Sequence, residues 1–403
     1  MNEPMMMIAL STAALVAVQF WLFRREMVFQ QARRGAVPTR LAAQFTPESY
    51  ATAVDYSVAK LSLGAVGILL NGILLLAWTV GGGMLFLDQL WLSVEFSDHG
   101  TDIAMVISVV TIQATLHRLL AAYRQFVVER RFGFGRMSVG LFLRDTCLQG
   151  LMTLLAAGVL VSACAVLLAE FGALRWVAVW AVWVVFSWAA SWLYPVIVAP
   201  LFNRFSRLDD EELTGRIDAL LIRAGCGPAK IQVMDGSRRT SHGNAHVVGI
   251  GGARRVVLLD TLLETLDKDE IVAVLAHEMG HIKHAHITKH QVFQAVSAFL
   301  WIVGVGQFLT STTILGDGAA LTTVWLAAPV FAILGRPLAS YLIRTFEYQA
   351  DAFVTEHDNP EALKTALLKL YARNASVEDS DPLFGFVYLS HPTLPQRLAG
   401  LAR

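Results

Sequence analysis

Residues 147–169 read CLQGLMTLLAAGVLVSACAVLLA, a stretch without a single charged side chain. A transmembrane helix needs about 20 apolar residues to cross the hydrocarbon core of a bilayer, so this stretch is long enough to span one. The composition agrees, because 55% of the 403 residues are hydrophobic and only 16% are charged. The stretch and the composition together indicate an integral membrane protein built mainly from helices.

Other apolar stretches repeat the same signal on both sides of this one. We expect six more transmembrane helices, at residues 6–23, 61–87, 103–122, 176–202, 291–316 and 318–335. The stretch 103–122 is less regular because it contains His117 and Arg118. An intramembrane ionisable pair usually faces a protein interior or a wet cavity, so we still count it as a span.

The first stretch also has the length of a signal peptide. It lacks basic residues in front of it, whereas Arg24 and Arg25 follow it directly. This order of charges favours an uncleaved anchor whose N-terminus lies outside.

Charged loops predict the sidedness of the seven spans, since arginine and lysine near span ends remain in the cytoplasm. Segments 24–60 and 123–146 are rich in arginine, whereas segment 88–102 and Asp317 are acidic. With an odd number of spans, both long polar segments are then cytoplasmic. The expected organisation is an N-terminal membrane region (1–202), the first part of a cytoplasmic domain (203–290), spans six and seven (291–335), and the second part of that domain (336–403).

Neither net charge nor cysteine content suggests another class of protein. Basic and acidic residues both number 32, so there is no electrostatic reason to expect a nucleic-acid partner. Cys147, Cys164 and Cys226 are too few and too scattered for a disulfide framework or a thiolate metal site. We interpret them as small buried hydrophobic side chains.

The most informative motif is His277-Glu278-Met-Gly-His281, which follows an apolar run that begins at Ile271. On a helix His277 and His281 stand one turn apart on the same face, where both imidazoles can bind one zinc ion. Glu278 lies beside them and can take a proton from a water activated by the metal. A chance occurrence in a surface helix is the alternative to this reading.

A catalytic zinc site needs a third protein ligand, and Glu347 is the candidate. It lies just after the last span, and Asp351 follows it on the same helical face. Asp351 can accept the second N–H of a zinc-binding histidine, although both carboxylates could also belong to a solvated charged face. His284, His286 and His290 also follow the motif, but we do not expect them to bind the catalytic metal.

Several stretches, taken in order, resemble the type-1 CAAX prenyl protease family of integral-membrane zinc endopeptidases. They are residues 126–134 (FVVERRFGF), 199–205 (APLFNRF), 237–245 (SRRTSHGNA), the motifs at 277–281 and 347–351, and 390–392 (SHP) followed by Arg397. The resemblance covers most of the chain. It implies a mainly α, polytopic membrane fold in which seven transmembrane helices enclose a water-filled chamber, with a zincin-like cytoplasmic α+β metalloprotease domain.

The resemblance also assigns roles to residues that the motif at 277–281 does not include. Asn244 and Ala245 match a strand that binds extended substrates, and His391 matches a histidine that stabilises an oxyanion. Arg397 is expected beside the metal ligands. Two positions depart from the family pattern: His246 stands where a tyrosine is usual, and Thr393 stands where a second proline is usual.

We therefore expect a monomeric membrane zinc endopeptidase with one Zn²⁺ per chain. Its partners would be the lipid bilayer and peptide or protein substrates, including prenylated CAAX-type C-termini, in a bacterial inner membrane or a eukaryotic endoplasmic reticulum membrane. A broad quality-control metalloprotease is the enzymatic alternative, although that type has fewer spans before the zinc motif. A metal-stabilised scaffold or transporter without hydrolysis is the second alternative, but it would not need Glu278.

Overall fold

A computed structural model describes the whole chain except residues 1–2, 95, 97, 249–254, 313–315 and 403. In this structure seven helical segments are long and apolar enough to cross a membrane. They are Met5–Gln31, Pro47–Trp78, His99–Arg131, Val139–Glu170, Gly172–Phe202, His286–Ser311 and Asp317–Leu334. The expected number of spans and the mainly helical membrane fold are thus confirmed.

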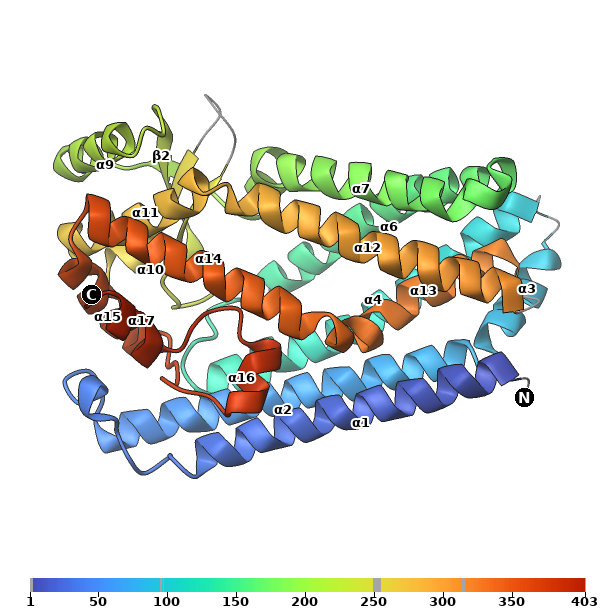
Figure 1. Cartoon of the computed structure of the whole chain (residues 1–403), viewed down its shortest axis with the longest axis horizontal. Coiled ribbons are helices and arrows are strands. Elements are labelled where there is room, and N and C mark those ends of the chain that lie inside the picture. Colours follow the sequence, from blue (N-terminus) through green and yellow to red (C-terminus); the bar gives the residue numbers. More distant parts are fainter. Residues whose placement is uncertain (1–2, 95, 97, 249–254, 313–315, 403) are drawn as a thin grey trace.

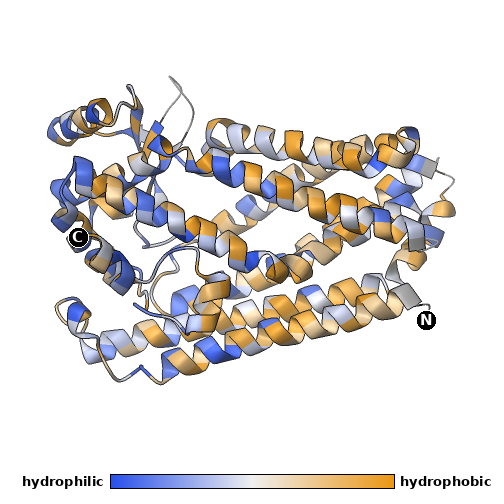
Figure 2. Cartoon of the chain, in the orientation of Figure 1, coloured by the Kyte–Doolittle hydropathy of each residue, from blue (hydrophilic) through white to orange (hydrophobic). Residues whose placement is uncertain are grey.

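The membrane helices lie side by side along the long axis of the molecule, and the polar domain sits at one end of them (Figure 1). They are α1 (Glu3–Gln31), α2 (Pro47–Trp78), α4 (Asp98–Tyr123), α6 (Val139–Glu170), α7 (Arg175–Leu193), α12 (His286–Thr312) and α13 (Asp317–Phe331). Hydrophobic residues dominate these helices, whereas hydrophilic residues gather at the domain end (Figure 2).

Several helices extend beyond the apolar stretches that predicted them. Helix α2 begins at Pro47, well before residue 61, because Thr46 caps it in a capping box with Ser49. It also ends at Trp78, so the expected span 61–87 was wrong at its C-terminal end. Gly82 adopts φ 78°, which breaks the helix, and α3 (Gly83–Leu92) then begins as a separate short helix.

Two membrane segments contain a π-helical turn near the polar domain. Turn η2 (Arg124–Val128) continues α4 into the short helix α5 (Glu129–Arg131). Turn η4 (Tyr194–Val198) continues α7 into α8 (Ala199–Phe202). Such turns insert an extra residue into a helix and are frequent at functional sites.

The polar domain contains one four-stranded sheet in the order β1-β2-β4-β3. The strands are β1 (Phe205–Arg207), β2 (Lys230–Met234), β3 (Ala245–Val248) and β4 (Arg255–Leu259). β2 and β4 are parallel, while β1 and β3 pair antiparallel with their neighbours. β3 is therefore an edge strand, and among the described residues no further strand pairs with it.

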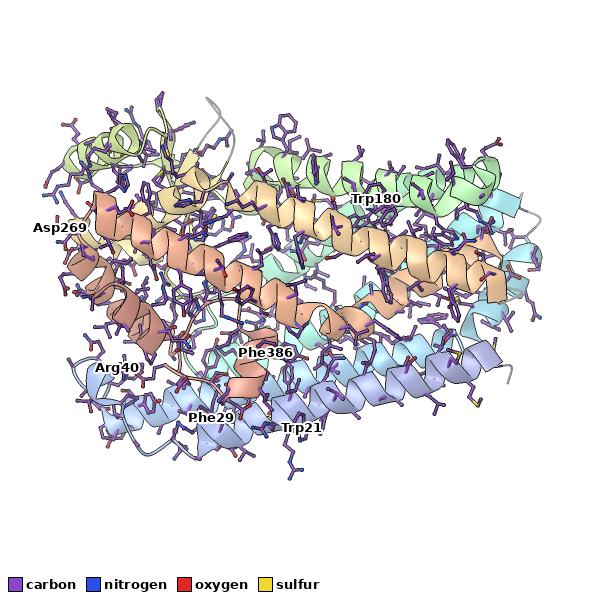
Figure 3. The ribbon with its side chains drawn as sticks, in the orientation of Figure 1. Trp21, Phe29, Arg40, Trp180, Asp269 and Phe386 are labelled. Carbon is purple, nitrogen blue, oxygen red and sulfur yellow. The ribbon has the colours of Figure 1, made fainter. Side chains whose placement is uncertain are left out.

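Helices from both polar segments cover this sheet and share one hydrophobic core. They are α9 (Glu211–Arg223), α10 (Asp260–Leu263), α11 (Lys268–Lys283), α14 (Arg336–His357), α15 (Pro360–Arg373) and α17 (Leu394–Gly400). Helix α16 (Pro382–Tyr388) is not part of this core, and its Phe384 packs with Leu22 of α1 and with Ile333. Ile217, Leu275 and Leu363 are among the almost completely buried members of the core, which also includes Tyr50 and Tyr56 from α2. Asp269 marks the polar end and Trp180 the membrane helices in Figure 3.

A buried carboxylate in α1 fastens this helix to the C-terminal part of the chain. Glu26 is 2% exposed. Its Oε2 accepts hydrogen bonds from Ser380 Oγ (2.9 Å) and from the backbone N–H of Asp381 (2.7 Å). One residue earlier, the Arg25 guanidinium pairs with the Asp381 carboxylate at 2.8 Å. The two contacts join the first membrane helix to the segment that precedes α16.

Candidate metal centre

The motif at 277–281 lies on α11, which begins where the sequence predicts a helix start. Asp267 caps the helix by accepting a hydrogen bond from the N–H of Glu270, and the Glu270 carboxylate accepts one from the N–H of Asp267 in return. Ile271, Leu275 and Met279 are buried in the domain core. The buried apolar face fixes the rotation of α11 and so directs the two histidines toward α14.

Gly280 allows α14 to come unusually close to α11. A Cβ atom at this position would lie 2.8 Å from Ala350 Cα and 3.0 Å from Phe353 Cβ. Since Ala350 follows Glu347 by one helical turn, this approach brings the Glu347 carboxylate to the two histidines.

Replacing Gly280 by Ala is expected to destabilise the domain by about 1–3 kcal/mol, because the new methyl group meets the backbone of α14. The midpoint of thermal unfolding in detergent would measure the change. Gly215→Ala is a matched control, since it lies inside α9 with nothing within 4 Å of the new Cβ. An unfolding midpoint for Gly280→Ala as high as that of Gly215→Ala would contradict the close-packing argument.

Three candidate ligand groups converge between these helices. His277 Nε2 lies 3.1 Å from His281 Nε2 and 3.5 Å from Glu347 Oε2, and His281 Nε2 lies 3.4 Å from Glu347 Oε1. Together they are the one group of potential metal ligands identified within the described part of the chain. A tetrahedral zinc site with bonds of about 2.0–2.1 Å separates its ligand atoms by about 3.3 Å, so the spacing suits zinc.

The other nitrogens of the two histidines determine which atoms face the centre. His277 Nδ1 lies 2.9 Å from Asp351 Oδ1, so it donates to that carboxylate and leaves Nε2 with a lone pair. His281 Nδ1 lies 2.9 Å from His286 Nδ1, and His286 Nε2 lies 2.8 Å from the amide oxygen of Gln349. If His286 donates to Gln349, its Nδ1 accepts from His281, and His281 Nε2 is also a lone pair.

The hydrogen bonds of the two Nδ1 atoms decide whether the site fits a metal. Two imidazole lone pairs and a carboxylate point at one place, and neither Nε2 can donate a hydrogen bond to the other. A divalent cation resolves this arrangement by accepting all three lone pairs. The residues present therefore fit a zinc ion.

Electrostatics around the centre agree with a site that holds positive charge. Burial lowers the pKa of His277, but its hydrogen bonds to Asp351 and Glu347 outweigh burial and raise the pKa to about 9. These contacts favour positive charge at His277 Nε2, which a proton supplies in the protein alone and a bound zinc ion would supply in its place. Burial raises the pKa of Glu347, but contacts with His277, His281 and His391 hold it well below the usual range. The carboxylate is therefore ionised and ready to bind a cation.

Arg397 from α17 holds the acceptor of His277 in place. Its guanidinium makes two hydrogen bonds with the Asp351 carboxylate, at 2.9 and 2.6 Å. Its Nη2 also lies 3.3 Å from His277 Nδ1. Asp351 and Arg397 are buried at 3% and 8% exposure, so this pair is shielded from solvent beside the ligands. The structure brings both residues next to the candidate ligand His277.

Glu278 has a different environment from Glu347. Burial raises the pKa of Glu278, although the neighbouring His277 and His281 act in the opposite direction. Among the described residues none makes a hydrogen bond or an ion pair with its carboxylate. Its oxygens are thus available to a water molecule next to the ligand group.

His391 reaches the same centre from the loop between α16 and α17. Its Nδ1 lies 2.9 Å from Glu347 Oε2, while its side chain is 63% exposed. The exposed imidazole is therefore at the open side of the ligand group, where it can contact a bound substrate. Of the histidines after the motif, His286 contacts a candidate ligand, whereas His284 stacks on His286.

Strand β3 packs against α11 and leaves one edge open next to the centre. The Leu259 N–H donates to Asn244 O at 3.1 Å, which makes Asn244 and Leu259 a hydrogen-bonded pair of the β3–β4 ladder. Because such pairs alternate, the backbone groups of Ala245 and Val247 face away from β4. Ala245 N–H is capped by the side chain of Asn244 at 2.9 Å. The other outward groups, the C=O of Ala245 and the N–H and C=O of Val247, can pair with an extended peptide.

His286 and Gln349 hydrogen-bond around the site but were not predicted from the sequence to belong to it. Gln349 lies on α14 between Glu347 and Asp351, and His286 is the first residue of α12. A hydrogen-bonding side chain near a zinc-binding histidine is a usual requirement of such sites. This requirement could have suggested a hydrogen-bonding partner for His281. The turn at Ala285, which brings His286 to that position, could not be predicted from the sequence.

Comparison with known proteins gives consistent matches over the whole chain. Residues 28–204 match a family profile described as CAAX prenyl protease N-terminal, five membrane helices, and residues 207–403 match peptidase family M48. The chain is similar to CAAX prenyl protease 1 homolog of Arabidopsis thaliana, with 32% identity over 83% of this chain and 80% of the relative. It is also similar to CAAX prenyl protease 1 of Saccharomyces cerevisiae, with 33% identity over 70% and 68%.

A solved structure extends the similarity to the fold. The crystal structure of S. mikatae Ste24p superposes with a TM-score of 0.87 and 26% sequence identity, covering 100% of this chain and 99% of the other. The similarity therefore includes the membrane helices as well as the polar domain.

Proposed function

This chain belongs to the CAAX prenyl protease family of M48 peptidases and is a membrane metalloendopeptidase, and from that premise we propose that it uses one zinc ion, held by His277, His281 and Glu347, to hydrolyse peptides bound along β3. The observation that carries the proposal is the convergence of two imidazole lone pairs and a carboxylate at 3.1–3.5 Å, with the unpartnered carboxylate of Glu278 beside them. The relatives' names do not favour the quality-control alternative.

A bound zinc ion would polarise the scissile carbonyl and lower the pKa of water toward ~7. Glu278 takes the proton from the attacking water and then passes it to the leaving amine. Asp351 and Arg397 keep His277 in the tautomer that presents Nε2, while His286 does the same for His281. His391 donates a hydrogen bond to the oxygen that becomes negatively charged. Ala245 and Asn244 hold the substrate backbone in register beside the centre.

The test is mass spectrometry of peptides incubated with the purified protein. Prenylated and unprenylated CAAX-type peptides should be compared, because the experiment also measures whether cleavage requires prenylation. We expect cleavage that a zinc chelator abolishes and added zinc restores. Cleavage that persists after complete removal of the metal would contradict the proposal.

We also propose that the polar domain is cytoplasmic, in a bacterial inner membrane or a eukaryotic endoplasmic reticulum membrane. The arginine-rich segments 24–60 and 123–146 lie toward the domain end of the molecule. At the opposite end Arg175 pairs with Asp317 at 3.1 Å. Asp102 accepts a hydrogen bond from the N–H of Gly318 there.

An engineered cysteine at Asp317 is expected to react with a membrane-impermeant reagent added from outside, because this end carries Arg175 but no arginine-rich segment of the kind that remains in the cytoplasm. A cysteine at Arg33 is the matched probe for the cytoplasmic side. Native cysteines would first be replaced by serine. Labelling of position 317 from the cytoplasmic side alone would reverse the topology.

A further inference from the structure

A polar cavity lies where the membrane helices meet the polar domain. Its volume is about 770 Å³, within the range of about 300–1,000 Å³ of small-ligand pockets. Its lining comes from α4 and η2, from α6, from η4 and α8, and from the segment that precedes β3. Both π-helical turns of the membrane region thus border the cavity.

Parts of three sequence stretches that contribute no metal ligand meet at this cavity. Glu129 and Phe134 belong to the stretch 126–134, Asn203 to the stretch 199–205, and Arg239 and His242 to the stretch 237–245. Phe134 stacks on His242 with ring centroids 4.7 Å apart. Arg239 Nη1 donates to Asn203 Oδ1 at 3.1 Å. The contacts build one structure from parts far apart in the sequence.

The cavity carries one positive charge that no carboxylate balances. Arg239 pairs with Asp145 at 2.8 Å, and Arg124 pairs with Glu129 at 3.1 Å. Arg118 also lines the cavity, but it has no hydrogen bond or ion pair with any residue that the structure describes. Burial lowers the pKa of His242, so its imidazole adds no charge at neutral pH.

Polar side chains of α6 face the cavity without partners. Thr146 Oγ1 and Gln149 Oε1 are buried atoms with no hydrogen bond to the described residues. Buried polar atoms of this kind usually bind water or a polar ligand. A peptide segment offers the N–H and C=O groups that would satisfy them.

The direction of β3 connects this cavity to the candidate metal centre. β3 runs from Ala245 to Val248, and Thr240 and His242 of the cavity lining precede it. A peptide added antiparallel to β3, the more stable pairing, runs the opposite way. Its residues after the cleaved bond therefore head toward Thr240 and His242, and its C-terminus heads into the cavity.

We propose that this cavity receives the last residues of the substrate and that Arg118 binds the free α-carboxylate at the C-terminus. The inference rests on the proposed function. Guanidinium and carboxylate form a charge-assisted pair, and the carboxylate neutralises the one unbalanced charge of the cavity. With the opposite chain direction a cationic N-terminal amine would face Arg118, which is unfavourable.

Two reporter peptides that differ only in a C-terminal acid or amide test this directly. The parent protein is expected to cleave the acid with a kcat/KM roughly 10- to 100-fold higher than the amide, as expected for loss of a hydrogen-bonded charge pair. Arg118→Gln should lower kcat/KM for the acid to the level of the amide and leave the amide unchanged. Unchanged amide cleavage also shows that the variant is folded.

A second measurement separates binding from chemistry. On the Glu278→Gln background, a fluorescent acid peptide should bind more tightly than its amide, and Arg118→Gln should remove the difference. Arg33→Gln is the matched control, because Arg33 is exposed in the turn after α1 and does not line the cavity.

Each possible outcome decides between the proposals. Equal cleavage of acid and amide by the parent would overturn the role of Arg118 and leave the proposed function standing. Preference for the acid that survives in Arg118→Gln would have the same meaning. If the zinc-loaded parent cleaved neither peptide, the proposed function would fall, and this inference with it.

Discussion

Glu278→Gln is expected to lower peptide hydrolysis by about 10²- to 10⁴-fold, because the amide cannot accept the proton of the attacking water. The side chain keeps its shape, and no described residue depends on the carboxylate for a hydrogen bond. Zinc content and the unfolding midpoint should therefore equal those of the parent. The measurement is kcat/KM for an extended reporter peptide together with metal analysis of the same sample.

His277→Ala provides the control for contaminating proteases, since it removes a metal ligand. Near-parental hydrolysis by Glu278→Gln, with His277→Ala inactive, would show that another group acts as the base. A scaffold or transporter would not respond to this substitution at all.

Loss of the Glu347 side chain is expected to empty the centre of zinc. It removes one of three ligands, so the effect on affinity should exceed the 10- to 100-fold typical for loss of a hydrogen-bonding group around the ligands. Glu347→Ala protein should contain well under one zinc per chain after dialysis, and its hydrolysis should fall in proportion. Metal analysis by mass spectrometry measures the first quantity and the peptide assay the second.

Glu356→Ala is the matched control for this experiment, because Glu356 lies on the same helix, α14, with its side chain 72% exposed. It should keep its zinc and its activity. Full zinc retention and normal activity in Glu347→Ala would remove Glu347 from the site.

The sequence predicted the parts of the fold that depend on local pattern. Long uncharged stretches identified the seven membrane helices, and the spacing of His277 and His281 placed them on one face of a helix. The span boundaries were less accurate, because helix ends depend on caps such as Thr46 and on the break at Gly82 more than on hydrophobicity. The search for long uncharged stretches found the spans, but it could not detect the polar N-terminal ends of α2, α6 and α12.

Tertiary contacts account for what could not be predicted. The close approach of α14 to Gly280 follows from tertiary packing. The sequence indicated only that a glycine at this position leaves room for a neighbouring chain. His286 becomes a partner of His281 only because Ala285 adopts φ 52° and turns the chain between α11 and α12. The balance of charges around Arg118 depends on three segments that are distant in sequence, so no motif predicted it.

The contact between Glu26 and the segment at 380–381 has a consequence for how the protein is made. Glu26 precedes its partners Ser380 and Asp381 by 354 and 355 residues, so it is synthesised well before them. Until they arrive, a carboxylate near the bilayer surface has only Gln30 on its own helix as a partner. The Glu26 carboxylate therefore gains two of its three hydrogen bonds only after the segment at 380–381 has been synthesised. Formation of this contact would link the final position of α1 in the membrane to the folding of the catalytic domain.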